Sequence, residues 1–260
     1  MRRSCRFLGR WLARYLQGQA RGPYPHLPAD LGVLQRVLQP ADVILVEGRQ
    51  RISGAIKYLT QSTWSHAALY VGDAGGQDAE GRRCTLLESD TELGVHVFPM
   101  QELAGYHLRV CRPLGLSAED TAQVVAYAMG RVGDRYDFKN IFDLMRYLLP
   151  TPPVPTPWRR RMLALGSGDP TRAICSTLIA QAFQSVGFPI LPLITREAAG
   201  DSNCRDCLLE HYHIRHYSLF VPRDFDVSPY FQIIKPGLFQ GDYHRLPWAN
   251  EKTFVARDVA

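Results

Sequence analysis

The sequence lacks long apolar runs and any strong excess of charge. Nowhere do about 18 apolar residues follow one another, so no membrane-spanning helix is predicted. Near the amino end, arginines interrupt the apolar residues, which argues against a signal peptide. The net charge of +5 is mild. No basic run interleaved with aromatics is long enough to follow a phosphate backbone, so nucleic-acid binding is not expected.

Cysteine is also sparse. The chain has six cysteines, too few and too irregularly spaced for a secreted disulfide scaffold. We therefore expect a reducing, cytoplasmic location. The six are Cys5, Cys84, Cys111, Cys175, Cys204 and Cys207.

Cys204 and Cys207 form a Cys-x2-Cys pair, with His211, His213 and His216 close behind. This spacing occurs in tetrahedral zinc sites. A second, distant pair is missing, however, and a structural loop or a reversible disulfide explains the spacing equally well. The sequence leaves these interpretations open.

Composition suggests one main domain with a segment at each end. Residues 1–39 hold a predicted amphipathic helix and a linker; the helix, at residues 5–17, has arginines opposite its apolar side. Such a helix contacts a membrane surface or docks on its own protein. The main domain is expected over residues 40–225, with a Pro-rich loop at 150–157, and residues 226–260 are expected to form a peripheral tail.

Several short apolar segments predict strands of a small antiparallel sheet or barrel. The expected strands cover residues 42–46, 64–73, 85–88, 94–98, 107–110 and 216–221. Expected helices cover residues 30–39 and 118–130, the last beginning after Ser117 as N-cap, and residues 52–59 form a short amphipathic segment. This pattern is typical of an α+β domain.

A further helix is predicted over residues 173–183, where apolar residues recur at helical spacing. Cys175 lies in its first turn, where the helix dipole and unpaired backbone N–H groups favour the thiolate. The alternative interpretation is that Cys175 is simply a small buried hydrophobic residue.

His66, Glu88 and Cys175 form a chemically coherent set. A thiol nucleophile needs a nearby base, and an imidazole base needs a third group to fix its orientation. His66 and Glu88 lie on predicted strands that can be neighbours, and Cys175 lies on a helix that can pack against them.

Four motifs in this order resemble those of circularly permuted papain-fold enzymes. They are Trp-Ser-His-Ala-Ala-Leu-Tyr-Val-Gly at 64–72, Leu-Leu-Glu-Ser at 86–89, Gly-Asp-Arg-Tyr-Asp-Phe at 133–138 and Ile-Cys-Ser-Thr-Leu-Ile-Ala at 174–180. The group belongs to the NlpC-type cell-wall peptidase superfamily and includes bacterial lipo-like proteins and relatives of lecithin:retinol acyltransferase. The resemblance spans roughly residues 40–190.

The resemblance implies a permuted papain-like fold, in which a small antiparallel sheet or barrel packs against the cysteine helix. It implies Cys175 as nucleophile, His66 as base and Glu88 as the residue that orients His66. Tyr136 matches the Tyr-Asp motif and is expected to line the site or to help hold an oxyanion. Ser176 and the backbone N–H of Cys175 are further oxyanion candidates, because they lie at a helix start.

The expected activity is thiol-dependent cleavage of an amide or ester bond through a thioacyl-enzyme. The resemblance admits a peptide, an N-acyl lipid or a lipid ester as substrate, and requires no metal or organic cofactor. The amphipathic start favours a membrane-associated substrate. Three alternatives stay open: a lipid acyltransferase, a non-catalytic binding module on the same fold, and a zinc-dependent protein organised by Cys204 and Cys207.

Overall fold

The computed structural model describes residues 29–90, 93–134, 174–198 and 208–235. Several predicted features lie outside these ranges: the amphipathic helix of residues 5–17, Tyr136, the Pro-rich loop of residues 150–157, and the pair Cys204 and Cys207. In the described part of the chain, no helix is long and apolar enough to cross a membrane.

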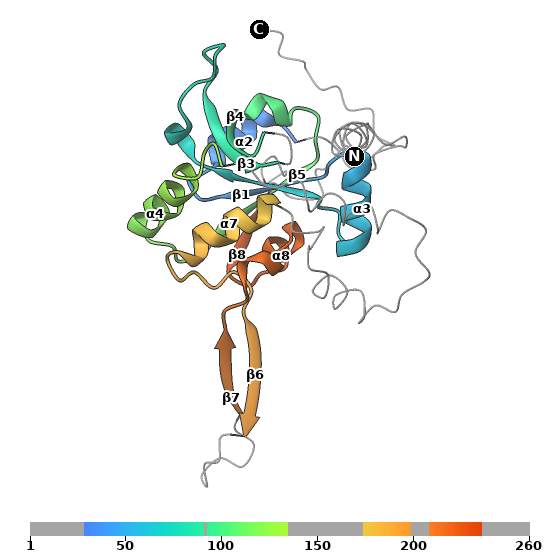
Figure 1. Ribbon diagram of the computed structural model, residues 1–260, viewed down its shortest axis with the longest axis vertical. Helices are drawn as coiled ribbons and strands as arrows, with labels where there is room; N and C mark the ends of the chain where they lie inside the picture. Colours follow the sequence, from blue (N-terminus) through green and yellow to red (C-terminus); the bar gives the residue numbers. More distant parts are fainter. Residues whose placement is uncertain (1–28, 91–92, 135–173, 199–207, 236–260) are drawn as a thin grey trace, which may run out of the picture.

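A six-stranded antiparallel sheet forms the centre of the structure (Figure 1). Its strand order is β4-β3-β2-β1-β5-β8. All four residues of β1 are buried, as expected for a strand covered on both faces. The strands are β1 (Val43–Val46), β2 (His66–Tyr70), β3 (Cys84–Ser89), β4 (Val95–Pro99), β5 (Leu108–Pro113) and β8 (Phe231–Ile234).

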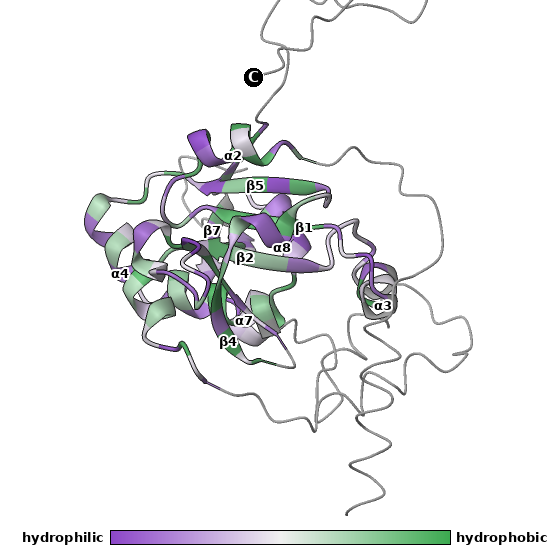
Figure 2. Cartoon of the chain, turned by 90° about the horizontal axis from the view of Figure 1, so that it is seen from above, coloured by the Kyte–Doolittle hydropathy of each residue, from purple (hydrophilic) through white to green (hydrophobic). Residues whose placement is uncertain are grey.

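The first four strands form a meander, but β5 does not continue it. β5 returns to pair with the free side of β1, so β1, β2 and β5 run side by side (Figure 2). The expectation of a peripheral tail from residue 226 is wrong for its first part. β8 pairs with β5, and its Phe231 is buried. The main domain therefore extends past residue 225.

The helices are α2 (Leu31–Val37), α3 (Arg51–Thr60), α4 (Ala118–Met129), α7 (Ile174–Gln184) and α8 (Pro222–Asp226), with short 3-10 turns η1 (Gly72–Gly75), η2 (Met100–Leu103) and η3 (Tyr217–Leu219). As predicted, α4 begins after Ser117, whose hydroxyl accepts the Asp120 N–H at 3.0 Å. Asp30 caps α2 in the same way. The strand expected at 216–221 is wrong: η3 lies there, and the His216 ring accepts the Ser218 N–H.

Hydrophobic side chains fill both faces of the sheet. On one face, Leu45 and Leu69 pack with Leu178 and Phe183 of α7, alongside α4. On the other face, Ile44 and other strand residues pack with α2 and η2. The cysteine helix is thus held against the sheet by a buried apolar face, and this packing fixes where its first turn lies.

Strands β6 (Leu193–Ala198) and β7 (Leu208–His213) pair as a separate two-stranded sheet that projects from the body (Figure 1). The sequence analysis did not predict it. Exposed apolar side chains lie along it: Leu193, Ile194, Leu209 and Tyr212.

Candidate active site

The structure brings His66, Glu88 and Cys175 together. His66 is the first residue of β2, Glu88 lies in β3, and Cys175 lies in the first turn of α7. The His66 Nε2 and Glu88 Oε2 atoms are 2.6 Å apart. The His66 ring is also hydrogen-bonded to the Cys175 thiol. Because α7 packs on both β2 and β3, one helix position reaches both strands.

The Cys175 thiol lies beside the first residues of β2, which do not pair with β3. Pairing of these strands involves Leu69↔Leu87 and Tyr70↔Leu86, so the first residues of β2 lie outside the ladder. Among them, the Ala67 backbone N–H is hydrogen-bonded to the thiol. A sulfur atom that accepts this bond carries partial negative charge at low cost.

The surroundings of Cys175 favour the thiolate. Its residue is only 4% exposed, and burial alone raises the pKa of a thiol. The charge and hydrogen bond of His66 outweigh burial, with help from the Ala67 N–H and the Ser176 hydroxyl, so the pKa of Cys175 lies below the ordinary thiol value. A buried thiol with a lowered pKa is typical of a nucleophile, whereas a buried structural thiol has a raised pKa.

His66 and Glu88 stabilise each other's charged forms. Burial lowers the pKa of His66, but the neighbouring Cys175 and Glu88 charges outweigh it and hold that pKa well above the ordinary value. Burial raises the pKa of Glu88, but His66, and then His96, outweigh it and hold this pKa well below the ordinary value. The directions of the three pKa shifts therefore favour the charged forms: thiolate, imidazolium and carboxylate.

Residues just before His66 are fixed by packing and hydrogen bonds. The Ser65 hydroxyl accepts the Gly48 N–H at 3.0 Å, and a Cβ atom at Gly48 would lie only 2.6 Å from that oxygen. Only glycine allows this close approach. The buried Trp64 donates its indole N–H to Asp226 Oδ2 at 2.9 Å. His66 therefore starts its strand from a rigid segment.

The two further site candidates have different outcomes. Ser176 is fully buried beside the thiol, with its Oγ 3.9 Å from Cys175 Sγ. Its contact is with the sulfur, and an oxyanion role stays a prediction. Tyr136 lies outside the described residues.

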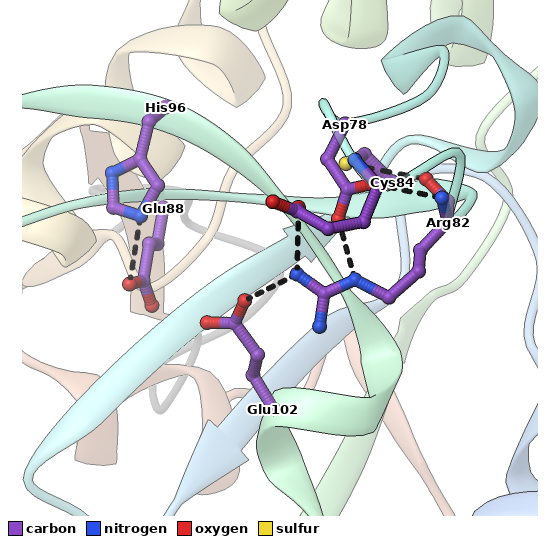
Figure 3. A network of polar contacts seen from close by, with 7 residues as sticks. Asp78, Arg82, Cys84, Glu88, His96 and Glu102 are labelled. Carbon is purple, nitrogen blue, oxygen red and sulfur yellow. Dashed lines mark hydrogen bonds and ion pairs between the residues drawn. The ribbon is translucent and has the colours of Figure 1, made fainter.

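His96 is a contact of the site that the sequence analysis missed. It lies in β4 directly opposite Glu88, and its Nε2 is 3.3 Å from Glu88 Oε1 (Figure 3). Glu88 thus bonds one imidazole through each oxygen. The sequence pattern predicted that His96 lies on a strand. Which residue lies opposite His96, however, depends on the register between the two strands.

Among the described residues, one group could hold a metal ion. Ligand atoms of Glu88, Asp90 and His96 lie within 4.8 Å of one another. Both oxygens of Glu88, however, already contact imidazoles, and a cation there would compete with His66 and His96 for them. We assign no metal to this group. The pair Cys204 and Cys207, which the sequence offers as a zinc alternative, lies outside the described residues.

Comparison with known proteins finds similarity to one family and to solved structures. Residues 37–147 match a family model described as permuted papain-like amidase enzymes (YaeF/YiiX, C92 family). Among solved structures, the crystal structure of the metalloprotein yiiX from Escherichia coli O157:H7 is similar, at 16% identity and a TM-score of 0.42 over 76% of this chain and 97% of that one. No curated protein matches the chain.

The matched stretch contains His66 and Glu88 and ends before Cys175. The antiparallel sheet with a packed cysteine helix is the architecture that the resemblance implied. The family description is narrower than the NlpC-type superfamily named from the motifs. Over residues 37–147, the chain matches the permuted papain-like amidases, and the predicted resemblance is confirmed.

Proposed function

We propose that this protein is a cysteine amidase in which Cys175 is the nucleophile, His66 the general base and Glu88 the residue that orients His66. The family match supports a cysteine-hydrolase type of function. The observation that carries the specific site is the His66 imidazole, which is bonded both to Glu88, at 2.6 Å, and to the Cys175 thiol. This is the arrangement that activates a thiol.

The proposed reaction has two stages. The Cys175 thiolate attacks the amide carbonyl carbon, and the imidazolium of His66 gives its proton to the leaving nitrogen as the C–N bond breaks. A thioacyl-enzyme and a free amine result. Neutral His66 then takes a proton from water, whose oxygen attacks the thioester and releases a carboxylic acid and the Cys175 sulfur.

Glu88 contributes without touching the substrate in this scheme. Its Oε2 accepts the Nε2 proton of His66, which leaves the other ring nitrogen to serve the thiol. A fixed carboxylate also stabilises the imidazolium that forms with the thiolate. We propose an amide as the scissile bond because the matched family is one of amidases. The acyl group is either a peptide or an N-acyl lipid.

The first test is the rate of iodoacetamide labelling at Cys175 between pH 5 and 9, with the labelled residue located by peptide mass mapping. We expect an apparent thiol pKa well below the free-thiol value of about 8.5, and an increase in His66→Ala. Cys84 is a matched internal control, because burial raises its pKa and it should label slowly. A normal Cys175 pKa, indifferent to His66, would refute the proposal and favour a binding module.

The second test concerns the chemistry after acylation. Model peptide amides, N-acyl amines and esters are incubated with the protein and with Cys175→Ala, and the intact mass is followed. A transient acyl adduct that is absent in Cys175→Ala supports the thioacyl-enzyme. If added amines or alcohols capture the acyl group faster than water does, the protein is an acyltransferase rather than a hydrolase.

A further inference from the structure

We propose that His96 is a positioning residue of this site, which holds the second oxygen of Glu88 and so fixes the carboxylate that orients His66. The inference rests on the proposed function. His96 does not contact the thiol in the polar contacts of the described residues; it acts through Glu88.

The strand order places Glu88 between two histidines. Strands β2, β3 and β4 are neighbours in the sheet and carry His66, Glu88 and His96 in that order. Glu88 and His96 are directly opposite each other in the β3–β4 ladder, so their side chains share a face. Oε2 is 2.6 Å from His66 Nε2, and Oε1 is 3.3 Å from His96 Nε2. Figure 3 shows the His96 ring directed at the carboxylate.

Both ring nitrogens of His96 face acceptors. Nδ1 is 3.2 Å from the Gly94 carbonyl oxygen, and Nε2 faces the ionised Glu88. A carbonyl oxygen and a carboxylate can only accept hydrogen bonds, so the two contacts favour a ring that is protonated on both nitrogens. The bond to Glu88 raises the pKa of His96 above its ordinary value, which agrees with this assignment.

Other groups hold His96 in this orientation. The Asp90 carboxylate accepts the backbone N–H groups of Leu93 and Gly94 at 2.6 and 3.2 Å, which fixes the Gly94 carbonyl that receives Nδ1–H. The Phe98 ring lies on the same strand with its centroid 5.9 Å from that of His96. Asp90 is also the other charged group that acts on His96.

A two-point hold changes what Glu88 can do. A glutamate side chain has three rotatable bonds, and a carboxylate bonded through one oxygen can swing about that bond. With Oε1 held by His96, the Oε2 lone pair stays aligned with His66, and the hydrogen bond to His66 needs no further ordering. Loss of His96 should therefore weaken the hold of Glu88 on His66 while both residues remain in place.

The test compares His96→Ala with His96→Gln, whose amide N–H can still donate to Oε1. The readout is the apparent pKa of Cys175 from the pH dependence of its labelling, in buffer with EDTA to remove adventitious cations. We expect a rise of about 0.5 to 1 unit in His96→Ala, hence a threefold to tenfold slower labelling below that pKa, and recovery of most of the rate in His96→Gln.

The decisive comparison is with Glu88→Gln. If His96 acts through Glu88, the Cys175 pKa in Glu88→Gln/His96→Ala equals that in Glu88→Gln alone. Additive shifts, or a His96→Gln variant as impaired as His96→Ala, would overturn the proposal. His211→Ala is the matched control, because His211 makes a similar contact to Glu197 at 2.9 Å on the projecting hairpin.

This result is separable from failure of the proposed function. If Cys175 in the wild type has an ordinary thiol pKa, the proposed function itself fails. If its pKa is low, rises in His66→Ala and is unchanged in His96→Ala, only the role of His96 fails. Circular dichroism and thermal unfolding of each variant show whether the fold is retained, and His96→Gln provides a second test if His96→Ala unfolds.

Discussion

Replacing Glu88 with glutamine should lower the pKa of the His66 imidazolium by about 1 to 2 units. The substitution keeps the size of the side chain and removes its charge. Glu88 Oε2 and His66 Nε2 are 2.6 Å apart, and the two side chains are 18% and 28% exposed, respectively. Because Glu88 raises the pKa of His66, its loss should make the ring give up its proton at lower pH.

Two effects limit the size of this shift. Unit charges 4 Å apart interact by about 4 kcal/mol at an effective dielectric constant of about 20, which would correspond to nearly 3 units. Partial exposure to water screens this interaction. The imidazolium of His96 also offsets part of the Glu88 charge. We therefore expect roughly 1.4 to 2.7 kcal/mol, the equivalent of 1 to 2 units.

The measurement is an NMR titration of the His66 ring in the full-length wild type and in Glu88→Gln, with thiolate absorbance at 240 nm followed in parallel. Glu102→Gln is the control, because Glu102 carries a similar charge but pairs with Arg82 at 3.9 Å in a separate network (Figure 3). An unchanged His66 pKa in folded Glu88→Gln would refute the charge coupling, as would an equal shift in Glu102→Gln.

Three further predictions concern stability. Gly48→Ala would force the new Cβ against two serine hydroxyls and should lower the free energy of unfolding in urea by about 1 to 3 kcal/mol. Gly54 is a helix position with nothing within 4 Å of a Cβ, so Gly54→Ala should raise the free energy of unfolding by about 0.5 to 1 kcal/mol. Similar values for both variants would contradict the contact argument. Asp42→Ala should cost about 3 to 5 kcal/mol, because Asp42 is fully buried and bonds Arg112 at 2.9 and 2.7 Å; a loss under 1 kcal/mol would mean that Arg112 finds other partners. The lowered pKa of Glu88 stabilises the folded state at pH values above the pKa of glutamate in the unfolded chain, about 4.3, and this contribution is lost as the pH falls below that value. From about pH 5 to 3, the unfolding free energy of the wild type should therefore fall more steeply than that of Glu88→Gln. Parallel curves would contradict this.

Local sequence patterns were sufficient to predict the elements that position the site. Short apolar runs with Gly or Asp at their ends identified β1 to β5, and the apolar spacing from Leu178 to Phe183 identified α7. These signals are strong because each element buries one face, and the residues on a buried face are apolar at regular intervals along the sequence.

Elements whose formation depends on distant partners were missed. β8 has four residues, and only pairing with β5 makes it a strand. The β6–β7 hairpin exposes apolar residues because its strands do not cover a core. Its sequence therefore lacks the alternation of apolar and polar residues that predicts a strand. At residues 216–221, the His216 ring accepts the Ser218 N–H at the start of the turn, and this local bond competes with the β-propensity of the segment.

The same distinction applies to the site. Motif order predicted the set His66, Glu88 and Cys175, which the structure brings together, but His96 depends on register. A shift in the β3–β4 pairing between Cys84 and Leu86 moves every later pair by one residue, and it brings His96 opposite Glu88. One residue of slip would put the ring on the other face of the strand. No spacing along the chain records such a shift.

Cys175 lies outside the family match, so its contact with His66 is a matter of packing rather than of the matched sequence. The matched stretch, residues 37–147, contains His66 and Glu88. The thiol reaches them by packing, because the buried face of α7 lies on β2 and β3. Burial alone would raise the pKa of a structural thiol at this position, as it raises the pKa values of Cys84 and Cys111. Cys175 alone of these three has a lowered pKa, and the group that lowers it most is His66, which lies in the matched stretch.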